Sequence, residues 1–446
     1  MAVKLTRVKG QCTRTKRSKP LFFTHSSAFS LDILRSSSSS QFSLLRFTKP
    51  NYSSPIRKSS HILTLSVRSS SFPQKGKYHR ELQAAVDVVE KACRLCVDVK
   101  KSLLSSDERI LEKNDQTPVT VADFGVQALI SLELGRLFPS IPLVAEEDSS
   151  FLTSNTVVDS IVNTVIDKSD STEKPLTRDV VLQAIDRGGK DGFTFGDKPA
   201  TYWVLDPIDG TRGFLKGSEA LYVVGLALVV EGEVTLGVMG FPNWLGDSST
   251  KSSNQDQTDK SGLPSGSGTI MAAHVGCGTW MKSLSDILGD MVGAQSSWSR
   301  CYVDKSCLVR EARFCISESQ TWESLPLSTL YSATTNSDSL GDKQVLLVPT
   351  CCGSLCKYLM VASGRASVFI YQAKAEKSVK SWDHAVGIIC VNEAGGQVTD
   401  WTGRKLDLAE DQIERRLIFP SGGVLITNGN VHNEILEVIS SVLPVI

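Results

Sequence analysis

The sequence predicts a protein of the α/β class with α+β character, in which helices and sheets form layers. One observation is that helix-like and strand-like segments are interleaved after residue 77. A second is the Val-rich alternating stretch at 221–241, with Glu231-Gly232 between its halves, which is typical of an antiparallel hairpin. Because helices and sheets must each bury an apolar face against another element, we expect them to stack in layers.

The first half of the ordered chain is predicted to be mainly helical. Apolar residues recur at helical spacing over 78–104 and again over 124–137. The segment 156–185 is also expected to be helical, with a loop at 167–174. Between these helices, the short apolar run 141–145 has the length of a strand.

The second half continues the alternation. Residues 345–348 and 366–370 are apolar runs of strand length, whereas 354–362 and 384–394 are predicted helices. Gly395-Gly396 is the stop signal expected at the end of the last of these helices.

Composition divides the chain into four parts. Residues 244–268 consist mostly of Ser, Gly, Asp and Lys, so they are predicted to be a low-complexity surface insertion. This insertion separates an N-terminal α+β sub-domain at 76–243 from a C-terminal α/β sub-domain at 269–446. Residues 1–75 form a leader.

The leader has the composition of an organellar transit peptide. Residues 1–80 contain sixteen Lys or Arg residues and one acid, Asp32, and they are rich in Ser. This Arg-rich, Ser-rich and acid-poor pattern is typical of import into an organelle. A basic arm that binds nucleic acid is the alternative. The long Ser-rich leader favours a plastid over a mitochondrion.

The distribution of charge and of apolar residues indicates which partners to expect. Since the formal net charge is zero and residues 1–80 carry about +15, residues 81–446 carry about −15. An acidic body lacks the basic footprint of a nucleic-acid-binding protein. No apolar run reaches eighteen residues, so no transmembrane helix is expected. We expect a monomer, with a dimer as the alternative.

The eleven cysteines are dispersed and predict no metal site. Cys93 and Cys96 lie on one face of a predicted helix and are interpreted as small buried hydrophobes. Cys351, Cys352 and Cys356 have no paired His cluster, which argues against zinc. Free thiols are expected in a reducing organelle, and a regulatory disulfide is the alternative.

The most informative stretch is WVLDPIDGTRGFLKG, residues 203–217. Asp206 and Asp209 lie on either side of Pro207, which cannot donate a hydrogen bond to a sheet, so the strand is expected to end near Asp206. Two carboxylates and the Thr211 hydroxyl at one strand end suit Mg²⁺, which prefers oxygen ligands. An exposed turn is the alternative for such residues.

Three other acidic positions are candidates for the same site. The acidic triplet 146–148 follows the apolar run 141–145, where it either faces a metal or lies in a solvated loop. Asp123 lies near the start of a predicted helix, and so does Asp383 in the sequence WDHA. Taken alone, Asp383 is most simply explained as a helix N-cap, and Asp123 as an N-cap or an acid of the first helical turn.

Together these segments resemble a known family. The set EED, DPIDGT and WDHA resembles the signature of the magnesium-dependent, lithium-sensitive phosphomonoesterases related to inositol monophosphatase. The strings PVTVAD, DPIDGTRGFLKG and SLCKY are similar to the 3'(2'),5'-bisphosphate nucleotidase branch of that family. The resemblance covers residues 78–446. It implies the sugar-phosphatase fold, a five-layered αβαβα sandwich of two joined sub-domains, of which 76–243 is the metal-binding one.

The resemblance also implies roles for individual residues. Two or three Mg²⁺ ions are expected in the site. Asp123 and Thr211 match the pair that activates the attacking water, and Thr211 and Asp383 also match substrate contacts. Ser354 and Lys357 match positions that bind the nucleotide. The implied metal ligands are Glu146, Asp206, the backbone carbonyl of Ile208, Asp209 and Asp383.

Two positions depart from the family pattern. Gln320 stands where the family has a substrate-contacting His, and Tyr371 stands where some members have an Arg. Both departures remove a cationic partner of the 5'-phosphate, so the identity of the substrate is less determined by the resemblance than the reaction type.

The resemblance implies hydrolysis of the 3'-phosphate of 3'-phosphoadenosine 5'-phosphate to leave AMP, with the 5'-phosphosulfate analogue as a possible second substrate. The first alternative is a phosphatase for inositol phosphates or another small ester on the same metal core. An alternative from another class is a non-catalytic nucleotide sensor. The five acidic side chains implied by the resemblance are all present, which argues against the sensor.

Overall fold

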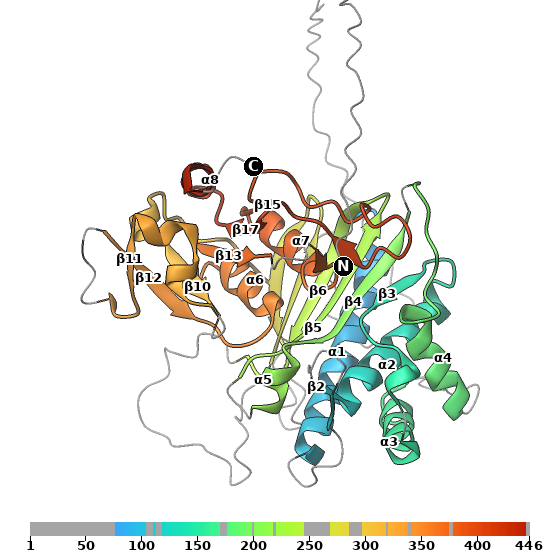
Figure 1. Ribbon diagram of the computed structural model, residues 1–446. Helices are drawn as coiled ribbons and strands as arrows, with labels where there is room; N and C mark the ends of the chain where they lie inside the picture. The colour runs from blue at the N-terminus through green and yellow to red at the C-terminus, as the bar shows by residue number, and fades with distance from the viewer. Residues whose placement is uncertain are drawn as a thin grey trace, which may run out of the picture. The chain divides into compact units, whose positions relative to one another are not determined.

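The structure is a computed structural model, in which two large sheets are separated and flanked by helices and two further sheets have two strands each (Figure 1). Predictions for the leader, and for nearly all of the insertion at 244–268, fall outside the described residues. The structure describes residues 76–103, 110–112, 118–152, 154–169, 176–198, 200–216, 220–244, 268–284, 297–317, 320–337, 341, 343–373 and 378–442.

Four helices form the first layer, as the sequence predicts. α1 is amphipathic and buries Leu82, Val86 and Cys93 against the sheet, while α2 is buried on almost every side. A capping box fixes the start of α2: the Thr120 side chain accepts a hydrogen bond from the helix, and Asp123 accepts one from the Thr120 backbone. The helices are α1 (His79–Leu103), α2 (Val121–Leu137), α3 (Asn155–Ile166) and α4 (Arg178–Gly188).

The second layer is a seven-stranded sheet in the order β3-β4-β5-β6-β7-β8-β9. β3 and β4 are parallel, and the other neighbours are antiparallel. The predicted hairpin is confirmed, because Glu231 and Gly232 join β5 to β6 with positive φ angles. The strands are β3 (Leu143–Ala145), β4 (Tyr202–Asp209), β5 (Val223–Val230), β6 (Glu233–Phe241), β7 (Thr269–His274), β8 (Gly278–Ser283) and β9 (Ser299–Arg300).

The division between the sheets differs from the expected boundary at residue 269. β7 pairs directly with β6, with Phe241 opposite Thr269. The sheet therefore continues across the insertion as far as Arg300, and the second sheet begins only with β10. The sequence before the insertion does not reveal this, because the edge of β6 is completed by a strand far along the chain.

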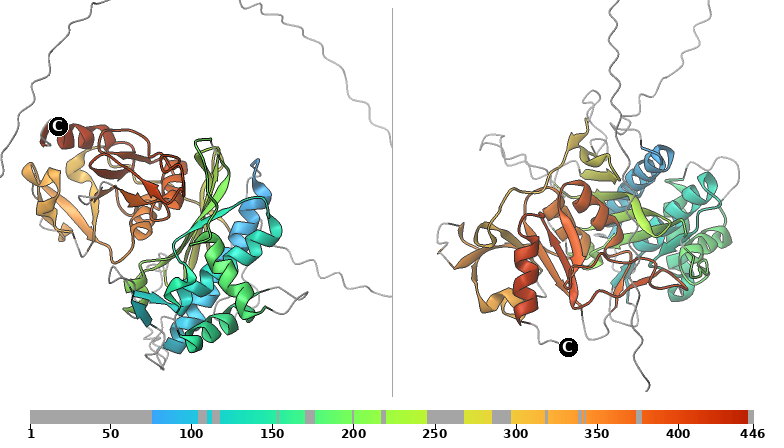
Figure 2. Two further views of the ribbon diagram at one scale, coloured as in Figure 1. Left: turned by 45° about the vertical axis from the view of Figure 1, so that its right-hand side comes forward. Right: turned by 90° about the horizontal axis from the view of Figure 1, so that it is seen from above.

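Two helices form the middle layer and contact both sheets. α6 (Ser354–Ala362) and α7 (Ala385–Glu393) pack on the face of the first sheet opposite α1, and on the second sheet as well. Figure 2 shows this from two further directions, with the blue and green helices on one side of the yellow-green strands and the orange and red elements on the other. Both helices lie where the sequence predicts them.

The second sheet has six strands in the order β11-β12-β10-β13-β17-β15. Its predicted strands 345–348 and 366–370 correspond to β12 and β13. Its pairing is mixed, since β10 is parallel to β12 and β13 whereas β17 is antiparallel to its neighbours. The strands are β10 (Arg313–Ile316), β11 (Ser332–Thr334), β12 (Gln344–Pro349), β13 (Val368–Gln372), β15 (Gln397–Asp400) and β17 (Gly423–Thr427).

α8 (His432–Val442) packs on β17 and completes the fifth layer, so the α/β class with alternating helical and sheet layers is confirmed. No helix among the described residues is long and apolar enough to cross a membrane. The remaining short elements are β1 (Ile110–Glu112), β2 (Pro118–Thr120), α5 (Thr211–Leu215), β14 (Val379–Lys380), β16 (Leu417–Ile418), and the 3-10 turns Ser149–Phe151, Val309–Glu311, Trp322–Ser324 and Pro326–Thr329.

Candidate metal centre

The centre of the candidate site is the end of β4, which does not stop at Asp206 as the sequence predicts. The strand continues to Asp209, and the pairing with β5 shifts register between these two aspartates. Pro207 is accommodated because it lies at this irregularity, where a ladder hydrogen bond from its nitrogen is not needed. Gly210 then turns the chain with a φ of 86° and α5 follows.

Three carboxylates meet at this strand end. One oxygen each from Asp206, Asp209 and Asp383 lies within 4.8 Å of the others. Asp206 and Asp209 come from the first sheet, whereas Asp383 directly precedes His384, the N-cap of α7. Asp383 is therefore not the helix cap that its position alone also suggested.

The structure also separates the two adjacent glutamates that follow β3. Glu146 lines the same pocket as the three aspartates. Glu147 is buried, and its backbone exchanges two hydrogen bonds with the Gln127 side chain of α2. Of the pair, it is Glu146 that lies with the other acids, as the sequence comparison implied.

The protonation of the cluster reflects its burial. Burial and the nearby carboxylates Glu146 and Asp209 raise the pKa of Asp206 well above its usual range. Burial likewise raises the pKa of Asp383 well above its usual range, and the charge of Asp209 adds to the rise. Such a group of acids needs a cation beside it to remain fully ionised at neutral pH.

Asp209 is held by the middle layer. Its two carboxylate oxygens accept hydrogen bonds from the backbone N–H groups of Ser354 and Leu355, at 3.0 and 2.6 Å. Burial raises the pKa of Asp209 to about 6, while the Lys357 charge and these two N–H donors oppose the rise. The first turn of α6 therefore fixes how this carboxylate is oriented.

Asp123 both caps α2 and contacts Thr211. One of its oxygens closes the capping box of α2 with Thr120, and the other accepts a hydrogen bond of 3.2 Å from the Thr211 hydroxyl. The same hydroxyl is 3.2 Å from the carbonyl oxygen of Ile208. The predicted pair of Asp123 and Thr211 is thus brought together beside the carboxylate cluster.

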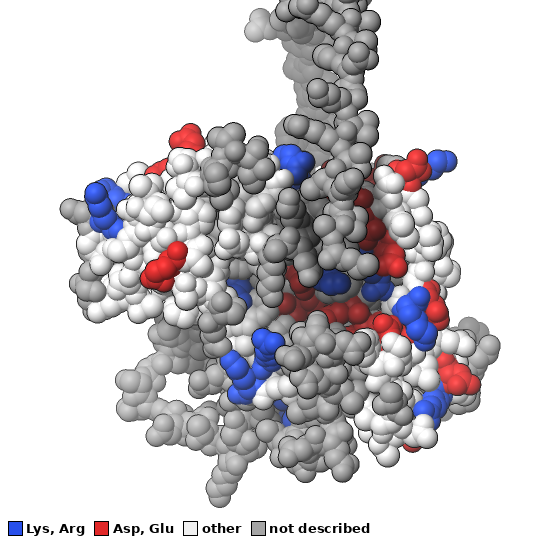
Figure 3. All heavy atoms as spheres, in the orientation of Figure 1, with Lys and Arg blue, Asp and Glu red and all other residues white. Residues whose placement is uncertain are grey.

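The carboxylates open onto a cavity of about 540 Å³. Figure 3 shows Asp and Glu gathered at the centre of this face, with Lys and Arg at their margin. Besides the acids, Ile208 and Thr211, the lining comprises Gly210, Arg212, Lys216, Ser317, Gln320, Ser324, Cys352, Gly353, Ser354, Lys357, Phe369, Tyr371 and Gln372.

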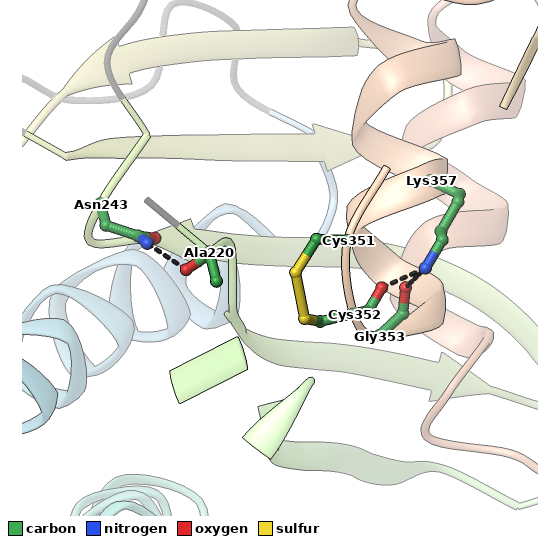
Figure 4. Close-up of a disulfide and its surroundings, with 6 residues drawn as sticks. All are labelled: Ala220, Asn243, Cys351, Cys352, Gly353 and Lys357. Atoms are coloured by element: carbon green, nitrogen blue, oxygen red, sulfur yellow. Dashed lines mark hydrogen bonds between the residues drawn. A yellow bond between two sulfur atoms is a disulfide. The ribbon is translucent and has the colours of Figure 1, made fainter. Parts of the chain in front are cut away.

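Lys357 lies in the wall of the cavity with Ser354, but its side chain is buried. Its ammonium group donates hydrogen bonds to the backbone carbonyls of Cys352 and Gly353, the latter at 2.7 Å (Figure 4). Lys357 therefore stabilises the turn before α6 in addition to contributing charge to the cavity.

The two departures from the family pattern both line the cavity. Gln320 donates a hydrogen bond of 3.1 Å to the carbonyl of Ile370, and the Tyr371 ring packs edge-on against His384. Burial lowers the pKa of His384 to about 3, so this imidazole is neutral. The wall that follows β10 and β13 is consequently polar but carries no cation among these residues.

The expectation of free thiols is wrong at one place. Cys351 and Cys352 form a disulfide beside the cavity (Figure 4), whereas the other cysteines of the described residues are free. A Cβ atom at Gly213 would lie 2.7 Å from Cys352 Sγ, so this turn packs directly on α5. The predicted burial of Cys93 and Cys96 is confirmed.

Sequence reasoning did not single out Arg212 and Lys216, which both line the cavity. They lie four residues apart in the string DPIDGTRGFLKG, directly after DPIDGT, and this spacing places two side chains on one face of a helix. The four-residue spacing of these two basic residues was the signal in the sequence that could have identified them.

The residues present fit a divalent cation. The donor set consists of carboxylate oxygens, and Asp206 Oδ1 is buried with no hydrogen-bond partner in the described part of the chain. An orphaned buried carboxylate oxygen is costly unless a cation or proton meets it. Hard oxygen donors of this kind are those that Mg²⁺ binds.

Known proteins resemble the chain over most of its length. A model of the inositol monophosphatase family matches residues 77–443. The chain is 60% identical over 408 residues, 91% of this chain and 98% of the relative, to a putative mitochondrial 3'(2'),5'-bisphosphate nucleotidase of Arabidopsis thaliana. It is 35% identical to the 3',5'-bisphosphate nucleotidase AHL of the same plant, over 77% of this chain and 93% of that one.

Solved structures are similar at lower identity. An inositol monophosphatase from Anabaena is 15% identical with a TM-score of 0.47, and the match covers 83% of this chain and 99% of that one. The inositol monophosphatase of Thermotoga maritima is 19% identical with a TM-score of 0.46, covering 81% and 98% of the two chains.

Proposed function

Because the chain belongs to the inositol monophosphatase family, we propose that it is a metal-dependent phosphomonoesterase that removes the 3'-phosphate of 3'-phosphoadenosine 5'-phosphate. The observation that carries this proposal is the convergence of Asp206, Asp209 and Asp383 beside the pair of Asp123 and Thr211. The choice of a nucleotide substrate rests on the names of the relatives.

The residues that would hold the cation are Glu146, Asp206, Asp209, Asp383 and the carbonyl of Ile208. We propose Mg²⁺ as the ion and two or three ions as the number, because these ligands are oxygen atoms from three separate segments. When bound, such ions supply Lewis acidity toward phosphoryl oxygen and lower the pKa of bound water.

The chain itself contributes positioning and proton transfer. Asp123 accepts a hydrogen bond of 3.2 Å from the Thr211 hydroxyl, and Thr211 lines the cavity. A water beside this pair would donate its proton toward Thr211 and Asp123 as its oxygen approaches phosphorus. General-base assistance of this kind contributes about 10²–10⁴-fold in rate.

A second candidate function is hydrolysis of an inositol phosphate or another small ester. It is favoured by one specific observation, the absence of a cation at Gln320 and Tyr371 in the cavity wall. The alternative of a nucleotide sensor predicts binding with no turnover.

The decisive experiment compares phosphate release from 3'-phosphoadenosine 5'-phosphate and from inositol 1-phosphate, each with and without Mg²⁺. We expect the higher kcat/KM for the bisphosphate and loss of release when Mg²⁺ is chelated. A higher kcat/KM for inositol 1-phosphate would support the second candidate. Absence of Mg²⁺-dependent release from both would contradict a phosphatase.

We further propose that residues 1–75 direct import into an organelle. Their Arg-rich, Ser-rich composition supports this, and the Arabidopsis relative is named as mitochondrial. The Ser-rich leader favours a plastid, so the two destinations need a direct test. A fluorescent reporter fused to residues 1–80 should enter one of the two organelles, and a reporter that stays in the cytosol would contradict import.

A further inference from the structure

The cavity must accommodate a second negative charge if its substrate is a nucleotide bisphosphate. Its metal end carries four carboxylates, Glu146, Asp206, Asp209 and Asp383, which repel any phosphate that is not bound to a cation. The wall containing Gln320 offers only neutral groups among the residues described above. The remote phosphate therefore needs a cationic partner elsewhere on the cavity lining.

Lys357 is poorly placed to be that partner alone. Its side chain is buried, and its ammonium group donates to the carbonyls of Cys352 and Gly353. Moving the ammonium group toward a ligand would remove hydrogen bonds from the turn that precedes α6. Such an exchange of one charge-assisted hydrogen bond for another yields little net affinity.

Arg212 and Lys216 are placed differently. Both line the cavity, and both side chains are exposed to solvent. They are four residues apart, with Arg212 in α5 and Lys216 directly after it as the C-cap, so this single turn presents them in the same direction. Figure 3 shows Lys and Arg gathered over the region of α5 next to the central carboxylates.

The opposite side of α5 fixes the orientation of these two cations. Gly213 and Phe214 are buried, and the Phe214 ring packs edge-on against Tyr222 at 5.0 Å between centroids. The Lys100 ammonium group lies 4.8 Å from the centre of the Tyr222 ring. Because this side is anchored in the core, Arg212 and Lys216 remain at the cavity and Thr211 remains at the metal centre.

We propose that Arg212 and Lys216 determine substrate specificity by binding the anionic group remote from the reacting phosphate, in a small ester that carries two phosphates. This inference rests on the proposed function. A guanidinium can form two parallel hydrogen bonds with a phosphate, and a nearby ammonium adds a point charge. Since both side chains border the acidic centre, their positive charges also attract the remote phosphate of the ligand away from the carboxylates.

The test compares two substrates that differ only in the remote phosphate, 3'-phosphoadenosine 5'-phosphate and adenosine 3'-phosphate. The full-length double variant Arg212→Gln/Lys216→Gln should raise KM for the bisphosphate by about tenfold for each charged hydrogen bond lost. The rise for the monophosphate should be smaller, so the ratio of the two kcat/KM values should fall.

Two further variants serve as controls. Arg212→Lys/Lys216→Arg keeps both charges and should retain most of the preference for the bisphosphate. Lys198→Gln/Arg310→Gln removes two exposed cations that are outside the cavity lining, and it should leave both KM values unchanged. An equal change for both substrates in the first double variant, or no change, would overturn the inference.

A binding measurement separates failure of this inference from failure of the proposed function. Adenosine 5'-phosphate carries only the remote phosphate, and its dissociation constant can be measured by calorimetry without added metal. The Gln double variant should bind it about tenfold or more weakly than the wild type. Undetectable binding by the wild type, or equal binding by both, would overturn the assignment of Arg212 and Lys216 whatever the turnover shows. Wild-type binding without hydrolysis of the bisphosphate would contradict the proposed function alone.

Discussion

Single carboxylates at the end of β4 are expected to decide turnover. Asp206→Asn keeps the shape of the side chain but removes a charge from the proposed metal site. A bound metal stabilises the transition state by several kcal/mol. Since about 1.4 kcal/mol corresponds to a tenfold change in rate, kcat/KM should fall by about a thousandfold. Steady-state kinetics at saturating Mg²⁺ measure this, with Asp159→Asn as the control, because Asp159 is an exposed acid on α3 outside the cavity. Turnover of Asp206→Asn within threefold of the wild type would contradict the assignment.

Lys357 is expected to act on every substrate rather than on nucleotides alone. Lys357→Met removes the donor to the carbonyls of Cys352 and Gly353, directly before the turn of α6 that orients Asp209. Loss of a charged hydrogen bond costs about 1.5–3 kcal/mol, so kcat/KM should fall by about tenfold or more. The fall should be similar for 3'-phosphoadenosine 5'-phosphate and inositol 1-phosphate. A loss confined to the KM of the bisphosphate would instead make Lys357 a direct nucleotide contact.

At the residue scale, the sequence predicted the proximity of the DPIDGT carboxylates better than it predicted the hydrogen bonds of Lys357. The residues of DPIDGT are close in the chain and their strand end is local, so their proximity follows from the motif. The bonding of Lys357 was not predictable, because it depends on a turn in which Cys352 has a positive φ of 59°. The Cys351–Cys352 disulfide depends on the same turn, and adjacency in sequence alone does not predict a bond.

At the scale of elements, α5 is expected to tolerate no side chain at Gly213. A Cβ atom there would lie 2.4 Å from the carbonyl oxygen of Leu221 and 2.7 Å from Cys352 Sγ. Gly213→Ala should therefore destabilise the protein by about 1–3 kcal/mol, the usual cost of overpacking, and displace Thr211. Urea unfolding and kcat measure the two effects. Gly196→Ala is the matched control, since nothing lies within 4 Å of its Cβ position, and equal behaviour of the two variants would contradict the packing argument.

The loop between β15 and β16 is expected to contribute less to the stability of the fold at acidic pH. Burial raises the pKa of Asp411, but backbone N–H groups of Glu414, Arg416, Leu417 and Ile413 outweigh it, so the pKa is lowered on folding. A lowered folded-state pKa stabilises the protein above the unfolded value, about 3.9, and this contribution is lost as the pH falls through the lower folded value.

Asp411→Asn should accordingly lower the free energy of unfolding at pH 7 by about 1–2 kcal/mol, because weaker neutral hydrogen bonds replace charge-assisted ones. The difference between wild type and variant should shrink below pH 4. Denaturant unfolding at pH 7, 5 and 3.5 measures it. A difference that stays constant over this range would mean that the Asp411 charge does not contribute to the stability of the loop.

Helices and the hairpin were predictable because their periodicity is local, as in α1 and in the pair of β5 and β6. The pairing of β6 with β7 was not, since 27 residues separate Phe241 from Thr269 and the intervening composition indicates only an insertion. Strand order depends on which apolar faces meet in space, and no local pattern in 269–300 indicates the partner. For this reason the observed end of the first sheet differs from the sub-domain boundary expected at residue 269.

For the whole molecule, the middle layer links the proposed metal centre to the fold. Asp383 precedes α7, and the first turn of α6 holds Asp209, while both helices pack on the two sheets. Cation binding should therefore stabilise the folded molecule as well as activate it. A ligand that binds only the folded state at a hundred times its dissociation constant adds about 2.7 kcal/mol to the free energy of unfolding.

In thermal unfolding of the full chain without substrate, Tm should rise with MgCl₂ concentration. A chelator should reverse this rise. Asp383→Asn should reduce the rise, because it removes the charge of the proposed ligand on the α7 side of the centre. KCl at matched ionic strength controls for screening of surface charge, which acts without site occupancy. If Asp159→Asn, Asp383→Asn and the wild type showed the same rise, the cation would be stabilising the protein somewhere other than at the junction of β4, α6 and α7.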